Sequence, residues 1–199
     1  MLELVSDGDR RSIVTASLRL GFRWSADRWI HAIELISPSR PIAWTIEGDL
    51  DRDDPTRVVS PAYQQLEFQE RGSGLQALLV GQSGPHHFSA VFSVEESPGG
   101  ADIAVDMADR CRSPIEALAC TYWVDAVSGD LLEADSSHIR WGIGSGHLDF
   151  QASAPSSAQL SEAGRRATRV QATAALDRGS NTQRCLYQWR WRAVASPLP

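Results

Sequence analysis

The chain has 199 residues, of which 42% are hydrophobic and 22% are charged. These values are typical of a globular protein and exclude a disordered or fibrous chain. Its 25 acidic residues outnumber its 19 basic ones, which gives a net charge of -6. Nucleic acids and anionic membranes bind cationic surfaces, so the charge balance argues against both as partners.

All 19 basic residues are arginines, because the chain contains no lysine. A GC-rich genome is the simplest explanation. The composition nevertheless excludes a lysine Schiff base and a lysine-dependent phosphate-binding loop. The positive charges all lie on planar guanidinium groups, which suit bidentate carboxylate binding and stacking on aromatic rings.

The chain contains three cysteines, an odd number with no CxxC spacing, so a disulfide scaffold is not expected. The N-terminal residues carry acids where a signal peptide needs bases. The longest stretch without Asp, Glu or Arg, residues 72–94, is interrupted by glycines and a proline and does not suit a membrane helix. We expect a soluble, cytoplasmic protein with a single domain over residues 1–199.

Alternation of apolar and polar residues, the signature of half-buried strands, runs through the N-terminal half. The apolar positions of the expected strands are Leu18 to Trp24, Trp29 to Leu35, Ile42 to Ile46, Phe88 to Val94 and Ile103 to Met107, at every second residue. The short connection at 25–28 predicts a hairpin between the first two.

The C-terminal half repeats this pattern. It predicts strands within 115–126, 139–143, 148–152, 170–176 and 187–193, the last with Tyr187, Trp189 and Trp191 facing inward. Two segments are ambiguous. Ser113 to Glu116 has the form of a helix capping box, and residues 156–167 suit either a loop or a short surface helix.

About eleven to thirteen short strands follow from these patterns, with no long amphipathic helix between them. Antiparallel hairpins produce such alternation, whereas parallel sheets give continuous apolar runs separated by helices. The sequence therefore predicts an all-β antiparallel sandwich, with a closed β-barrel as the alternative.

Metal binding is not expected. Asp49, Asp51 and Asp53 match the opening of an EF-hand loop, but Asp54 stands where that loop needs glycine and Ser60 where it needs glutamate. The histidine and cysteine spacings fit no standard zinc pattern. No cofactor motif is present either, so we expect no cofactor.

Residues 81–87, Gly-Gln-Ser-Gly-Pro-His-His, superficially resemble a serine-hydrolase elbow. That motif needs a helix after the serine, and here an alternating strand follows. His86 and His87 point to opposite faces of an extended chain, so they do not readily share a metal. His86 and His87 are the best candidates for an acid or base that works near neutral pH. A histidine at the start of a strand, however, more often has only a structural role.

Four further residues are candidates for ligand binding. Asp106 and Arg110 share one face of their strand, with Asp109 on the other, and suit bidentate recognition of a sugar or serve as an internal ion pair. Most of the seven tryptophans lie on apolar strand faces and are expected in the core. Trp123 is the exception, between Thr121 and Asp125, and Arg190 faces solvent or a cleft.

Three functions remain open. The leading hypothesis is a sandwich that binds a small polar, carbohydrate-like ligand over one sheet without catalysis. The alternative is a cofactor-independent sugar epimerase, isomerase or lyase, with His86 or His87 as base and Arg110 holding the substrate. The third is a structural or assembly domain. The oligomeric state is not predicted.

Overall fold

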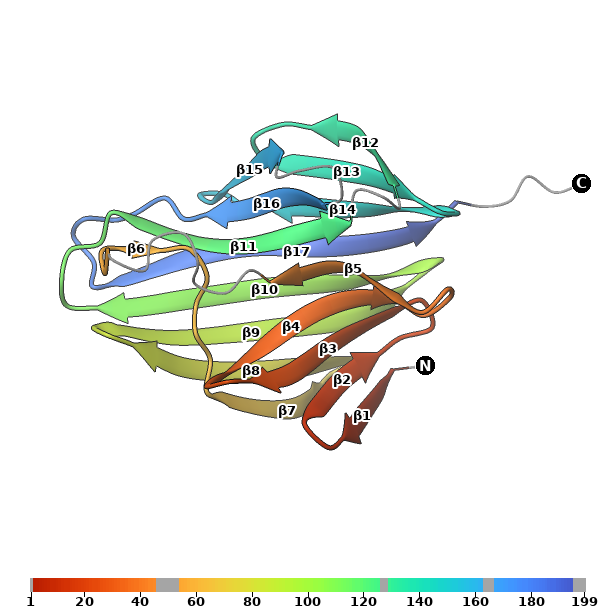
Figure 1. Ribbon diagram of the computed structural model, residues 1–199, viewed down its shortest axis with the longest axis horizontal. Coiled ribbons are helices and arrows are strands. Elements are labelled where there is room, and N and C mark those ends of the chain that lie inside the picture. Colours follow the sequence, from red (N-terminus) through yellow and green to blue (C-terminus); the bar gives the residue numbers. More distant parts are fainter. Residues whose placement is uncertain (1, 46–53, 126–128, 163–166, 195–199) are drawn as a thin grey trace, which may run out of the picture.

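The computed structural model describes residues 2–45, 54–125, 129–162 and 167–194. Within these ranges there are seventeen strands and no helix, and 72% of the residues lie in strands. The strands form two layers, which overlap in the view of Figure 1. No helix that could span a membrane is present in the described part of the chain.

The first sheet has the order β1-β2-β3-β4-β5-β11-β16-β15, and the short β6 also pairs with β11. All its pairs are antiparallel except β6 with β11. Its strands are β1 (Glu3–Asp7), β2 (Arg10–Val14), β3 (Leu18–Ser25), β4 (Arg28–Leu35), β5 (Arg40–Thr45), β6 (Arg57–Val58), β11 (Ala117–Asp125), β15 (Ser157–Glu162) and β16 (Ala167–Thr173).

The second sheet has the order β12-β13-β14-β17-β10-β9-β8-β7 and is antiparallel throughout. Its strands are β7 (Gln65–Arg71), β8 (Gly74–Ser83), β9 (His86–Ser97), β10 (Gly100–Cys111), β12 (Gly129–Ala134), β13 (His138–Ile143), β14 (Gly146–Ala152) and β17 (Thr182–Ala193).

One hydrophobic core joins the inward faces of the two sheets. Period-two alternation places every second side chain in this core, and β17 is the clearest case. Tyr187, Trp189 and Trp191 are buried, while Gln188 and Arg190 between them are only partly buried. The inward orientation predicted for the aromatic residues of this strand is confirmed.

The all-β sandwich is confirmed, and the barrel alternative is wrong because neither sheet closes on itself. The expected strand number was too low. The alternation rule overlooked strands such as β1, β6 and β12, which are short and show no regular alternation of apolar and polar residues.

Neither segment considered for a helix forms one in the residues that the structure describes. The capping-box sequence at Ser113 lies in an irregular connection before β11, and β15 occupies residues 157–162 of the second segment. The residues of β15 are mostly small or polar, so their sequence does not clearly predict a strand. The strand forms because it pairs along β16.

Three tryptophans expected in the core are less buried than predicted. Trp44 is only partly buried because a bulge in the pairing of β4 with β5 lets both Ile42 and Ala43 be buried and turns Trp44 outward. Trp24 and Trp29 face each other at the end of the β3–β4 hairpin, and Trp24 is 37% exposed.

Candidate functional site

His86, at the start of β9, is buried against the connection that precedes β6. Its Nδ1 lies 2.7 Å from Asp109 Oδ2, and its Nε2 lies 2.6 Å from the carbonyl oxygen of Pro55. Because the carbonyl oxygen can only accept a hydrogen bond, Nε2 carries a hydrogen and donates it to Pro55. A second hydrogen lies between Nδ1 and Asp109 Oδ2. Both ring nitrogens are therefore engaged within the protein.

The carboxyl group of Asp109 is fully buried, and its Oδ1 has no hydrogen-bond partner in the described part of the chain. Burial raises the pKa of this carboxyl, and the hydrogen bond from His86 opposes the rise. A pocket of about 660 Å³ opens beside His86, lined by residues from Ala26 to Arg28, from 54–62 and from 83–88. His86 thus forms part of the wall of this pocket, but both of its ring nitrogens are already hydrogen-bonded and neither is free to act as a base on a ligand.

The exposed His87 points to the opposite face of β9, the outer face of the second sheet. There its cross-strand neighbour is Arg110. Asp106 lies on the same face four residues before Arg110, about 13 Å away along β10. The structure therefore brings His87 beside Arg110 but leaves Asp106 at a distance, where it pairs with Arg184 at 3.3 Å.

Arg190 also lies on this outer face, opposite Asp102 at 3.7 Å, and Asp102 is a further four residues from Asp106. Trp123 is on the outer face of the first sheet, on the other side of the sandwich. The sequence candidates therefore do not converge on one site. Asp49, Asp51 and Asp53 lie outside the described residues.

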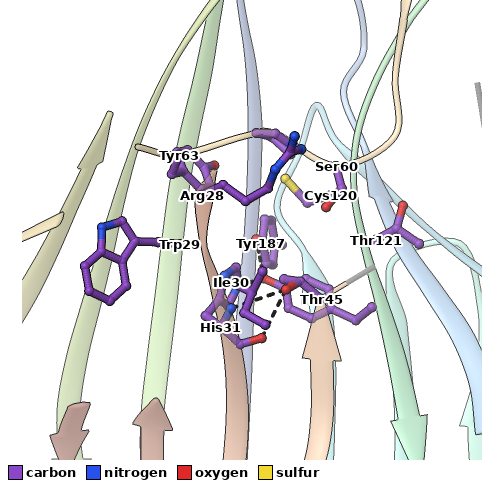
Figure 2. Close-up of a pocket in the computed structure, with 12 residues that line it drawn as sticks. Arg28, Trp29, Ile30, His31, Thr45, Ser60, Tyr63, Cys120, Thr121 and Tyr187 are labelled. Carbon is purple, nitrogen blue, oxygen red and sulfur yellow. Dashed lines mark hydrogen bonds between the residues drawn. The ribbon is translucent and has the colours of Figure 1, made fainter. Parts of the chain in front are cut away.

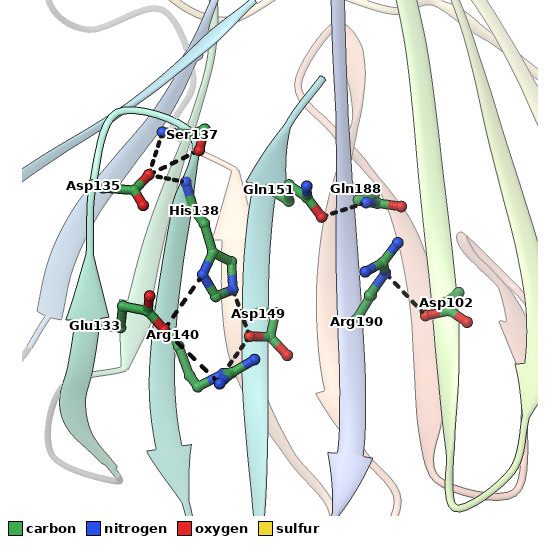
Figure 3. Close-up of polar contacts among 10 residues, drawn as sticks. All are labelled: Asp102, Glu133, Asp135, Ser137, His138, Arg140, Asp149, Gln151, Gln188 and Arg190. Carbon is green, nitrogen blue, oxygen red and sulfur yellow. Dashed lines mark hydrogen bonds and ion pairs between the residues drawn. The ribbon is translucent and has the colours of Figure 1, made fainter. Parts of the chain in front are cut away.

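The second sheet carries a network of charged side chains on the strands nearest β12 (Figure 3). Asp149 accepts hydrogen bonds from His138 Nε2 at 2.7 Å and from Arg140 Nε at 2.6 Å, and Glu133 lies 3.6 Å from the other nitrogen of His138. Each acid of this network has Arg140 and His138 as neighbours on the same face, an arrangement typical of cross-strand pairs.

The outer face of the first sheet bears a groove of about 460 Å³ over β1 to β5, the strands side by side in Figure 1. Its floor is one row of cross-strand neighbours: Val5, Ser12, Gly21, Ala32 and Trp44. The three central side chains are small, so the surface is low there, and the large indole of Trp44 closes one end.

Two rows of longer side chains flank the floor. One row contains Asp7, Arg10, Arg23 and Ile30, and the other contains Arg19, Glu34 and Pro41. Arg19 and Glu34 pair at 3.3 Å. From β1 to β5 the floor spans four inter-strand spacings, about 19 Å, a length that suits a short oligosaccharide better than a single sugar.

The aromatic surface continues past the end of the groove. Trp123 on β11 is the direct cross-strand partner of Trp44, so both indoles lie on the outer face. Both are partly buried. Two indoles on one half-exposed face provide apolar surface on which a sugar ring can stack.

A buried polar network lies on the inner side of the first sheet, next to the Trp44 end of the groove. Figure 2 shows His31, Thr45 and Tyr187, which belong to it. His31 Nε2 lies 2.8 Å from the hydroxyl oxygen of Tyr122, which lies 2.6 Å from that of Tyr187. Burial lowers the pKa of His31 to about 3, so the ring is neutral at pH 7. The backbone of His31 also exchanges hydrogen bonds with the Thr45 hydroxyl.

Sequence reasoning did not find the groove. Its floor is made of small residues that carry no chemistry, and the outward orientation of Trp44 depends on the bulge. One signal was present, because Arg19, Gly21 and Arg23 alternate on the polar face of one strand. A glycine between two long side chains on the outward face of a strand leaves the surface lower at that position.

Among the described residues, no group of three or more His, Cys, Asp or Glu side chains is placed to hold a metal ion. No known protein family matches the chain, and no curated protein is detectably similar to it in sequence.

Proposed function

We propose that the chain is a non-catalytic binding protein for a small polar, carbohydrate-like ligand, held in the groove on the outer face of the first sheet. The observation that carries the proposal is the combination of a low floor at Ser12, Gly21 and Ala32 with an aromatic wall at Trp44. Sugar rings are recognised by stacking on aromatic faces and by hydrogen bonds from polar walls.

A groove of this size lies within the range of small-ligand sites, about 300–1,000 Å³. Its polar walls supply guanidinium donors, which hydrogen-bond hydroxyl groups in fixed directions. The proposal places this activity in the cytoplasm, since all three cysteines are free thiols, as is usual in a reducing compartment.

The test is calorimetric titration with neutral tetrasaccharides: cellotetraose, maltotetraose, xylotetraose and fully methyl-esterified tetragalacturonate. We expect saturable binding of at least one of them, and Trp44→Ala should weaken it at least tenfold. Trp24→Ala is the matched control, because Trp24 is an exposed indole at the edge of the inward face. Equal losses from both variants, or no binding of any member and none of tetragalacturonate, would contradict the proposal.

A second variant avoids any change to the core. A Cβ atom at Gly21 would make only ordinary contacts, 3.7 Å to Glu34 Oε1 and 3.9 Å to Arg19 Cδ. Gly21→Ala therefore raises the floor without a clash and should weaken binding at unchanged thermal stability. Ala104→Val, on the exposed outer face of the second sheet, should leave binding intact.

A catalytic alternative rests on a different observation, the placement of exposed His87 beside Arg110. A histidine base next to a guanidinium would serve a cofactor-independent sugar epimerase, isomerase or lyase. Proton NMR of the same saccharides in D₂O tests it. Exchange of a ring proton that His87→Ala removes would favour the enzyme over the binding protein.

A further inference from the structure

Two arginines face each other across neighbouring strands at the groove. Arg10 on β2 and Arg23 on β3 are direct cross-strand partners on the outer face, so their Cβ atoms are about 4.5–5.5 Å apart. Like charges in this arrangement repel each other and destabilise the pairing. Both side chains line the groove.

Neither guanidinium has an ion-pair partner within 4.0 Å among the described residues, although Asp7 is the cross-strand neighbour of Arg10. The opposite wall differs, because Arg19 is neutralised there by Glu34 at 3.3 Å. The positive charge of the groove is therefore concentrated on one side, within reach of a ligand on the floor.

We propose that the groove selects acidic saccharides and that Arg10 and Arg23 together bind the carboxylate of a uronic acid unit, an inference that rests on the proposed binding function. Two guanidinium groups can donate up to four hydrogen bonds in parallel pairs to carboxylate oxygens. The neighbouring floor and Trp44 then receive the sugar rings of the same ligand.

The net charge of the groove favours a singly charged group at the Arg10–Arg23 pair. The outward walls carry three arginines, Arg10, Arg19 and Arg23, against two acids, Asp7 and Glu34, which leaves one net positive charge. A uronate carboxylate at the Arg10–Arg23 pair balances this charge, whereas a phosphate dianion exceeds it.

The experiment compares tetragalacturonate with its fully methyl-esterified form, which has the same rings and no charge. The full-length chain should bind the acid at least tenfold more tightly at low salt, because a charge-assisted hydrogen bond is roughly twice as strong as a neutral one. Arg23→Gln and Arg10→Gln should each reduce this preference severalfold, because they weaken binding of the acid more than binding of the ester. Arg71→Gln, an exposed arginine on β7, should change neither affinity.

The outcomes separate the two proposals. Equal binding of acid and ester, or a preference that survives Arg23→Gln, would overturn the assignment of Arg10 and Arg23 and leave the saccharide groove standing. Binding of neither form, with no binding of the neutral tetrasaccharides, would overturn the groove itself. Displacement of bound tetragalacturonate by equimolar inorganic phosphate would contradict the selection of a carboxylate.

Discussion

At the scale of single residues, His31 is the most informative buried polar group. A neutral imidazole avoids the cost of burying a charge, and the hydroxyl of Tyr122 satisfies its Nε2. The ring also packs against Phe92 at 4.7 Å between centroids. The histidine thus serves as a core residue whose position depends on staying unprotonated.

This arrangement makes stability depend on pH with a definite sign. The pKa of His31 is about 3 in the folded state and about 6.5 in the unfolded state. Between these values the unfolded chain binds the extra proton, so the free energy of unfolding falls as pH is lowered, by up to about 1.4 kcal/mol per pH unit from this residue. The stabilisation is fully present above about pH 6.5.

Urea unfolding of the wild type and of His31→Phe at pH 7.5 and pH 4.5 measures this effect. The phenylalanine variant should lose less stability between the two pH values than the wild type does. The raised pKa of Asp109 acts in the opposite direction and is common to both proteins, so the difference isolates His31. An identical pH dependence in both would contradict a buried neutral imidazole.

Adjacent residues on β17 give a second test at this scale. Trp189 is 1% exposed and lies 4.6 Å from Phe150 and 5.1 Å from Tyr122 between ring centroids. Trp189→Ala should therefore cost about 3–5 kcal/mol of unfolding free energy, since it leaves a large cavity.

Arg190→Ala should cost under about 1 kcal/mol, because its pairing with Asp102 is 3.7 Å long and partly exposed to solvent. Denaturant titration of both variants provides the comparison. Small and equal losses would mean that β17 does not form the centre of the core.

At the scale of strands, two glycines in regular strands have opposite surroundings. Gly81 on β8 lies directly under the backbone at Ala62, and a Cβ atom there would approach the Ala62 carbonyl oxygen too closely to be accommodated. The segment before β7 can cross β8 only because position 81 has no side chain, and the hydrogen bond from Gln64 N to Val80 O holds it there.

The same substitution at the two positions should separate them. Gly81→Ala should destabilise the fold by about 1–3 kcal/mol, since the backbone must shift to admit the methyl group. Gly21→Ala should be neutral within about 0.5 kcal/mol, because its position on the groove floor is open. Thermal unfolding of both variants measures the difference, and equal losses would contradict the close approach at Ala62.

The strands also show how far the alternation of apolar and polar residues predicts which side chains face the core. Alternation was sufficient for β17, β14 and β13, where large apolar side chains face a core on one side only. It failed for β5, because one bulge reverses the face of every later residue in the strand. A bulge is set by pairing with β4 and leaves no mark in the local sequence.

At the scale of the whole molecule, the fold class was predictable and the candidate site was not. Fold class follows from the period of the pattern, which each strand carries in its own residues. The groove depends on which strands are neighbours. Ser12, Gly21, Ala32 and Trp44 come from four strands, and only their register aligns them in a row.

The strand content gives a direct check of the architecture. The circular dichroism spectrum should be dominated by strand, well above the 20–25% typical of globular domains. A spectrum with the double minimum of a mainly helical protein would contradict the two-sheet fold.

The most direct test of the groove uses the seven tryptophans as reporters. With 5-fluorotryptophan incorporated and each resonance assigned by substitution, ¹⁹F NMR is recorded as tetragalacturonate or its methyl ester is added to saturation. The resonances of Trp44 and Trp123 should move with a common saturation curve, while those of Trp24, Trp141 and Trp189 stay in place. Shifts confined to Trp24, or none at ligand concentrations that saturate the calorimetric signal, would contradict binding on the outer face of the first sheet.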